Sequence, residues 1–167
     1  EQFEIVKPCE VELIEPRFKT FLAAFVIGDI HGCAIQLEKL LTMSEGHPIV
    51  FAGDLVDRGP DDARVLDIVL ETLSNQPNKS AFTPGNHDTS YKYRLNLDKD
   101  YPRRKSIADK LDQVLEFRSD WVEGANWIVT HSPCDEKYLK KNDKISLEKS
   151  INFKRSSQGF HCNSQIQ

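Results

Sequence analysis

Three short glycine-bearing segments, each placed directly behind an apolar run, constrain the fold of this chain most. They are Gly28-Asp-Ile-His-Gly32, Gly53-Asp-Leu-Val-Asp-Arg-Gly59 and Gly85-Asn-His-Asp88. The apolar runs at 22–28, 48–52 and 80–83 predict short buried strands, and apolar spacing at 33–43 and 60–74 predicts helices between them. This alternation is typical of an α/β sheet of mostly parallel strands, whose active sites lie beyond the strands' carboxyl ends. We therefore expect the three segments to converge.

The rest of the chain carries weaker patterns. Residues 88–104 are polar and predict irregular structure, whereas 106–117 have the apolar spacing of a helix. Two apolar stretches around Glu123-Gly-Ala-Asn126 predict a hairpin whose second strand leads to His131. We expect an N-terminal extension over 1–20, a core over 21–134 and a polar segment over 135–167.

Composition favours one globular domain. Hydrophobic residues make up 39% of the 167 and charged residues 29%, and the net charge of -4 excludes a strong global field for nucleic acid. The four cysteines form no CxxC pair, which argues against a zinc knuckle and is typical of reduced thiols in a cytoplasmic protein. No apolar run reaches membrane-spanning length, so we expect no membrane partner.

The polar residues of the segments suit divalent metal ions. Asp29, His31, Asp54, Asn86 and His131 offer carboxylate oxygen, imidazole nitrogen and amide oxygen, which are ligands for ions such as Mn, Fe, Zn or Ni. A carboxylate such as that of Asp54 can bridge two ions. Two ions about 3.5–4 Å apart can clamp a phosphoryl group and activate water.

With these residues in view, the chain resembles the calcineurin-like metallophosphoesterases over roughly residues 22–133. The three segments match the family's signature motifs in order, and Val129-Thr-His131 matches a fourth. Gly53–Gly59 resembles the phosphoprotein phosphatase branch, while Asp88 is typical of its bacterial and phage members. The resemblance implies an α/β fold, a β-sandwich core flanked by helices, and two divalent metal ions.

The resemblance also implies a role for each residue. Asp29 and His31 would bind one ion, Asp54 would bridge both, and Asn86 and His131 would bind the second. His87 would protonate the leaving oxygen, Asp57 would pair with His87, and Arg58 would bind substrate phosphate. The implied reaction is hydrolysis of phosphate monoesters by metal-activated water, without a covalent phospho-enzyme.

The substrate stays open among three readings. The first is a Ser/Thr-type or broad phosphatase that acts on phosphorylated proteins or small phosphoesters, with manganese as a typical ion. The second is a phosphatase of nucleotides, dinucleoside polyphosphates or RNA ends. The third is a truncated or inactive binding domain, because the family's late Gly-His motif is missing after His131. The single histidine in that part of the sequence is His161, which is a candidate metal ligand.

A basic cluster behind the third segment is a candidate for substrate binding. Arg94, Arg103 and Arg104, interleaved with tyrosines, could hold a phosphate backbone. The competing reading is a solvated charged face.

Overall fold

The computed structural model describes residues 18–94 and 101–132, which form two small sheets and four helices. The α/β fold expected from the sequence is confirmed: strands and helices alternate through the first half of the chain. Arg94 and Arg103 lie at helix positions whose side chains are not described, and His161 and the predicted segment 135–167 lie outside the described residues.

The first sheet contains β2 (Phe25–Ile27), β3 (Ile49–Phe51) and β4 (Ser80–Phe82), in that order and all parallel. Helices α1 (Ala34–Met43) and α2 (Asp62–Asn75) connect these strands. All three strands therefore end at the same edge, where the glycine-bearing segments begin.

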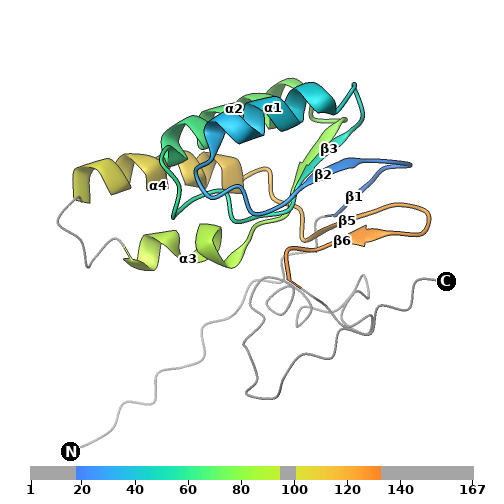
Figure 1. The fold of residues 1–167 in the computed structure, drawn as a ribbon. Helices are drawn as coiled ribbons and strands as arrows, with labels where there is room; N and C mark the ends of the chain where they lie inside the picture. Colours follow the sequence, from blue (N-terminus) through green and yellow to red (C-terminus); the bar gives the residue numbers. More distant parts are fainter. Residues whose placement is uncertain (1–17, 95–100, 133–167) are drawn as a thin grey trace, which may run out of the picture.

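The second sheet contains β1 (Phe18–Thr20), β5 (Trp121–Glu123) and β6 (Ile128–Val129). Strand β5 pairs parallel to β1 and antiparallel to β6, so the hairpin expected from the sequence is present. Figure 1 shows β5 and β6 below the first sheet, with α1 and α2 above it. Strand β1 was not predicted, because three residues carry too little pattern to identify a strand.

The side chains of the first sheet alternate between two cores, as the pleat requires. Ile27, Phe51 and Phe82 are buried against the helices. Val50 and Ala81, on the other face, are buried with Val122 of β5. The chain is thus a layered structure in which helices cover one face of the first sheet and the second sheet covers part of the other.

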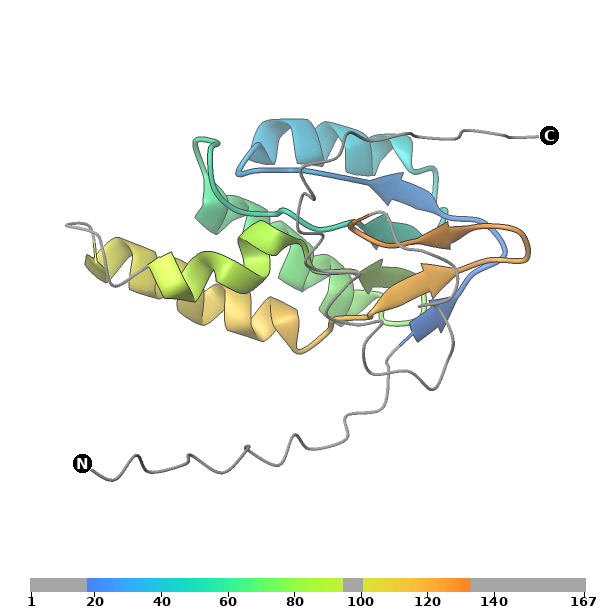
Figure 2. The same cartoon turned by 90° about the horizontal axis from the view of Figure 1, so that it is seen from below.

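Two further helices follow the third segment. They are α3 (Asn86–Arg94) and α4 (Tyr101–Leu115), and α4 packs against α2. Seen from below, the strands gather on one side of the molecule and α3 and α4 extend to the other (Figure 2). The expectation of irregular structure over 88–104 was wrong for 88–94 and 101–104, which are helical, and residues 95–100 lie outside the described part. Helix α3 is anchored by buried Asp88 and Tyr91 rather than by an apolar stripe.

The prediction of a fully buried strand over 22–28 was also wrong. Strand β2 is the edge strand of its sheet and begins at Phe25. Leu22 is 94% exposed and Val26 is 47% exposed. Apolarity alone could not reveal this, because the second sheet leaves the outer strand of the first sheet partly uncovered. No helix of the described residues is long and apolar enough to cross a membrane.

Candidate metal centre

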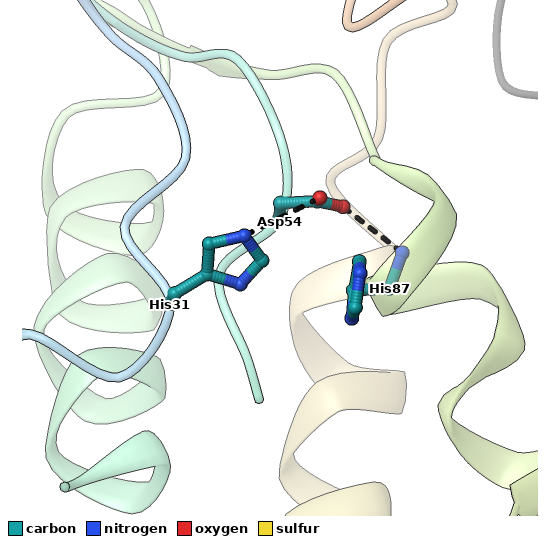
Figure 3. A group of neighbouring side chains, drawn as sticks. All are labelled: His31, Asp54 and His87. Atoms are coloured by element: carbon teal, nitrogen blue, oxygen red, sulfur yellow. Dashed lines mark hydrogen bonds and ion pairs between the residues drawn. The ribbon is translucent and has the colours of Figure 1, made fainter. Parts of the chain in front are cut away.

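The three glycine-bearing segments converge at the carboxyl ends of β2, β3 and β4. Backbone hydrogen bonds join the first two: the amide of His31 donates to Asp54 O (2.9 Å) and the amide of Gly32 donates to Leu55 O (2.9 Å). The third segment joins through the His87 amide, which donates to Asp54 Oδ1 (2.9 Å). Figure 3 shows His31, Asp54 and His87 facing one another.

Asp54 lies at the centre of this group and is 4% exposed. Its Oδ2 lies 3.6 Å from His31 Nε2, and its Oδ1 lies 3.5 Å from His131 Nε2. The two oxygens of one carboxylate therefore face two different imidazoles. That is the arrangement in which a carboxylate can contribute to two neighbouring ion positions.

Backbone carbonyls determine which nitrogen of each imidazole is protonated. His31 Nδ1 lies 2.9 Å from Val56 O, and His131 Nδ1 lies 2.7 Å from Ala52 O. A carbonyl can only accept, so both Nδ1 atoms donate and, in the neutral rings, the Nε2 lone pairs point toward Asp54. Metal-ligating histidines in proteins are oriented in the same way.

A fourth acceptor reaches the same point. Asn86 Oδ1 lies 3.3 Å from His131 Nε2. The lone pairs of two imidazoles, one carboxylate and one amide oxygen thus converge. A cation bound between them would offset the repulsion among these lone pairs. The donor set, two nitrogens and harder oxygens, fits a borderline divalent ion.

Asp88 holds the backbone of this centre in place. Its Oδ2 accepts from the amides of Asp54 (2.8 Å) and Gly85 (2.9 Å), and its Oδ1 accepts from the amide of Leu55 (2.8 Å). Burial raises the pKa of Asp88 to about 6, while the three backbone donors act in the opposite direction. The bond to Gly85 is one half of a capping box. In it, the side chain of an acidic residue at the third helical position accepts from the backbone N–H of the residue before the helix.

A second cluster surrounds His87. Its Nδ1 lies 2.9 Å from Asp57 Oδ2, so this nitrogen donates to a carboxylate. Its Nε2 lies 3.0 Å from Arg58 Nη2, and Arg58 Nη1 lies 3.5 Å from His31 Nε2. The guanidinium therefore spans the space between the two imidazoles, where an anionic group would find an Arg and a His together.

Among the described His, Cys, Asp and Glu residues, the group whose ligand atoms all lie within 4.8 Å of one another is His31, Asp54 and His87. Both ring nitrogens of His87 already have partners, since its Nδ1 is bonded to Asp57 and its Nε2 to Arg58, which favours a role beside the ions over that of a ligand. The structure does not bring Asp29 into this group: Asp29 is exposed at the end of β2. Arg104 lies near the start of α4 and is half-buried.

The backbone of the site is strained. Five non-glycine residues that are predicted to function at the site have positive φ, a backbone conformation that L-residues rarely adopt. They are Asp29 (39°), His31 (45°), Asp54 (52°), Asp57 (73°) and Arg58 (70°). Non-glycine residues with positive φ gather at functional sites, where the surrounding structure holds them in place.

Sequence reasoning missed the residues that support the site. The acceptor role of Asp88 and that of Asp62, whose Oδ1 accepts from the amide of Asp57 (3.0 Å), were not predicted. The spacing Gly85-x-x-Asp88 was a usable signal, because an acidic residue three positions after a cap satisfies the cap's amide. The carbonyls of Ala52 and Val56 carry no signal, because every residue has one.

Comparison with known proteins agrees with this geometry. The sequence profile of the calcineurin-like phosphoesterases matches residues 23–159. A bis(5'-nucleosyl)-tetraphosphatase PrpE [asymmetrical] of Oceanobacillus iheyensis is 28% identical over 71% of this chain and 59% of its own. A symmetrical bis(5'-nucleosyl)-tetraphosphatase of Photorhabdus laumondii is 35% identical over 64% of this chain and 37% of its own.

A solved structure assigned as a diadenosine tetraphosphatase superposes with a TM-score of 0.54 at 26% identity. The match covers 71% of this chain and 55% of that one. This chain therefore spans less than two thirds of each of these three proteins.

Proposed function

The chain belongs to the calcineurin-like phosphoesterase family, and on that premise we propose that it is a metal-dependent hydrolase of dinucleoside polyphosphates. The observation that best supports a metal-dependent hydrolase is the position of the Asp54 carboxylate, whose two oxygens face the Nε2 atoms of His31 and His131. The substrate class rests on the relatives, whose printed activities are those of bis(5'-nucleosyl)-tetraphosphatases.

His31 and Asp54 would hold one divalent ion, and Asp54, Asn86 and His131 a second. Asp29 remains a candidate ligand because it lies between the end of β2 and His31, two residues from each, although it is exposed. Ions bound here would supply Lewis acidity toward a phosphoryl oxygen and toward water. The donor set favours Mn, Fe, Zn or Ni over Ca, which prefers oxygen ligands alone.

The chain's own residues would handle the leaving group. Hydrolysis forms a bond from water oxygen to phosphorus and breaks the bond from phosphorus to the bridging oxygen, which needs a proton. His87 would supply that proton from Nε2 when both ring nitrogens are protonated. Asp57 orients the ring through Nδ1, and Arg58 Nη2, which lies 3.0 Å from Nε2 in this structure, would donate to the substrate phosphate instead. Arg58 would bind the phosphate, because its planar fork of donors fits phosphate oxygens.

The reading as a Ser/Thr-type protein phosphatase has less support than the nucleotide reading. The relatives named above act on dinucleoside tetraphosphates by their printed names. The basic cluster expected to favour RNA adds nothing, because the side chains of Arg94 and Arg103 are not described. We therefore put dinucleoside polyphosphates first.

The test compares wild type with Asp54→Asn in the presence of Mn. We expect wild type to hydrolyse diadenosine tetraphosphate faster than an aryl phosphate or a phosphopeptide, and Asp54→Asn to lose bound metal and turnover together. Asp109→Asn is the matched control, because it makes the same change at an exposed residue that pairs with Lys105. Equal rates in wild type and Asp54→Asn would contradict the hydrolase.

Product analysis then refines the substrate class. Asymmetric cleavage of a dinucleoside tetraphosphate yields a nucleoside triphosphate and a monophosphate, and symmetric cleavage yields two diphosphates. Preference for the phosphopeptide would instead restore the protein phosphatase reading.

A further inference from the structure

Asp62 is an acidic residue in the first turn of α2 whose side chain turns back toward the site instead of capping the helix. The cap is supplied by its neighbour Asp61, whose Oδ1 accepts from the amide of Arg64 (3.0 Å). Asp62 Oδ1 accepts from the amide of Asp57 (3.0 Å), five residues earlier. Two adjacent carboxylates therefore have different partners: Asp61 caps α2, and Asp62, the first residue of α2, accepts from the loop before the helix.

The bond from Asp62 acts on a segment with two consecutive residues of positive φ. Asp57 and Arg58 have φ of 73° and 70°, which L-residues adopt only when the surroundings hold them. An amide fixed by an acceptor limits rotation about the adjoining backbone bonds. Asp57 Oδ2 in turn bonds to His87 Nδ1, and Arg58 Nη2 to His87 Nε2, so this carboxylate and this guanidinium both extend from the segment that Asp62 holds.

The neighbouring loop is shaped to accept Asp62. A Cβ on Gly32 would lie 2.5 Å from Asp62 Oδ1, so only glycine leaves room for this carboxylate. The amide of Asp61 also donates to Gly32 O (3.0 Å), which holds the start of α2 against the same glycine. The position of Asp62 is thus set by two segments and not by its own rotamer alone.

Asp88 provides the contrast within the site. It accepts from the amides of Asp54, Leu55 and Gly85, which support the ligand side of the centre. None of these three amides belongs to the pair around His87. The two supporting carboxylates therefore serve different halves of the site.

We propose that Asp62 is a positioning residue for proton donation: by holding Asp57 and Arg58, it fixes the ring of His87 for the leaving oxygen. This inference rests on the proposed function for the role of His87. It assigns Asp62 no contact with substrate or metal.

The first test needs no turnover. Amide hydrogen exchange of Asp57, followed by NMR on the full chain, should be faster in Asp62→Ala by about tenfold or more, since each factor of ten reflects about 1.4 kcal/mol of lost protection. Asp62→Asn keeps an acceptor oxygen and should exchange like wild type. Asp61→Ala removes the cap of the same helix. It should speed amide exchange in the first turn of α2 but leave the exchange rate of the Asp57 amide unchanged. Equal exchange in wild type and Asp62→Ala would overturn the proposal.

The second test uses leaving groups. Without a proton donor, turnover depends steeply on the leaving group, so Asp62→Ala should lose about tenfold or more in kcat/KM on phenyl phosphate and much less on 4-nitrophenyl phosphate. His87→Gln should show the same selective loss more strongly, and Asp62→Asn should recover most of it. Metal content should match wild type.

These results separate the two proposals. If His87→Gln shows no selective loss, the proposed role of His87 fails, and the placement of Asp57 by Asp62 is then decided by exchange alone. If His87→Gln shows it but Asp62→Ala loses both substrates in parallel, or Asp61→Ala matches Asp62→Ala, the inference about Asp62 is wrong.

Discussion

Glycines at the site differ in what they make room for. A Cβ on Gly59 would lie 1.8 Å from His31 O, whereas a Cβ on Gly28 would meet nothing within 4 Å. We expect Gly59→Ala to lower the free energy of unfolding by about 1–3 kcal/mol, because backbone atoms must move apart. Gly28→Ala, the control, should stay within about 0.5 kcal/mol. Urea denaturation of both variants measures this, and similar midpoints would contradict it.

Asp88 satisfies three buried amides with two oxygens. Asp88→Asn replaces one of those oxygens by an amino group, which leaves at least one buried N–H without an acceptor. We expect a loss of about 1–3 kcal/mol in unfolding free energy, together with weaker Mn binding by calorimetry, because Asp54 loses its backbone support. Asp109→Asn should change neither by a comparable amount. Unchanged stability in Asp88→Asn would show that the amides find other partners.

At the scale of single residues, the motif residues could be predicted from the sequence, but the orientation of their side chains could not. The sequence places His31, Asp54 and Asn86 behind three strands, and these segments do converge. The carbonyls that orient the imidazoles belong to Ala52 and Val56, whose side chains give no hint of that role. Asp62 escaped notice because an acid after Pro60 reads as part of a helix start, and its actual target lies across the loop.

Helices α2 and α4 form the main helical contact behind the site. Leu111 of α4 is 1% exposed in the core that α2 shares, and Lys110 pairs with Asp67 of α2 at the rim. We expect Leu111→Ala to cost about 2–5 kcal/mol through lost burial and a residual cavity. Leu22→Ala makes the same change at a residue that is 94% exposed and should cost less than about 0.5 kcal/mol. Thermal unfolding of both variants checks the difference.

Prediction of the elements succeeded where a buried face repeats along the sequence. Helices α1 and α2 lie close to their expected bounds, because each presents apolar side chains to the first sheet. Ile35 of α1 is apolar but 66% exposed, since that helix buries only a narrow stripe of side chains. Helix α3 could not be predicted from periodicity, because its sequence is polar on most sides.

At the scale of the whole molecule, metal binding should couple to folding. The candidate ligands come from segments that follow three strands of one sheet and from His131, two residues after β6, so they are assembled only in the folded chain. Binding to the folded state alone should add about 2.7 kcal/mol to unfolding at a metal concentration 100 times the Kd. We expect Mn to raise the melting temperature and EDTA to reverse the rise.

The matched variants for that measurement are Asp54→Asn and Asp109→Asn. The first should lose the Mn-dependent shift, because it removes the carboxylate that faces both imidazoles. The second should keep it. A shift of equal size in both variants would indicate that Mn binds elsewhere on the acidic surface.

The left-handed backbone of Asp54, Asp57 and Arg58 has a consequence for anyone who selects variants of this protein by heat resistance alone. Each of these residues costs on the order of 1 kcal/mol relative to a conformation that L-residues prefer. Glycine at the same positions would relieve that cost, so a screen for thermostability should enrich glycine where the chemistry is carried. Such a screen would need an activity filter from its first round, or it would return a better-folded protein without a working centre.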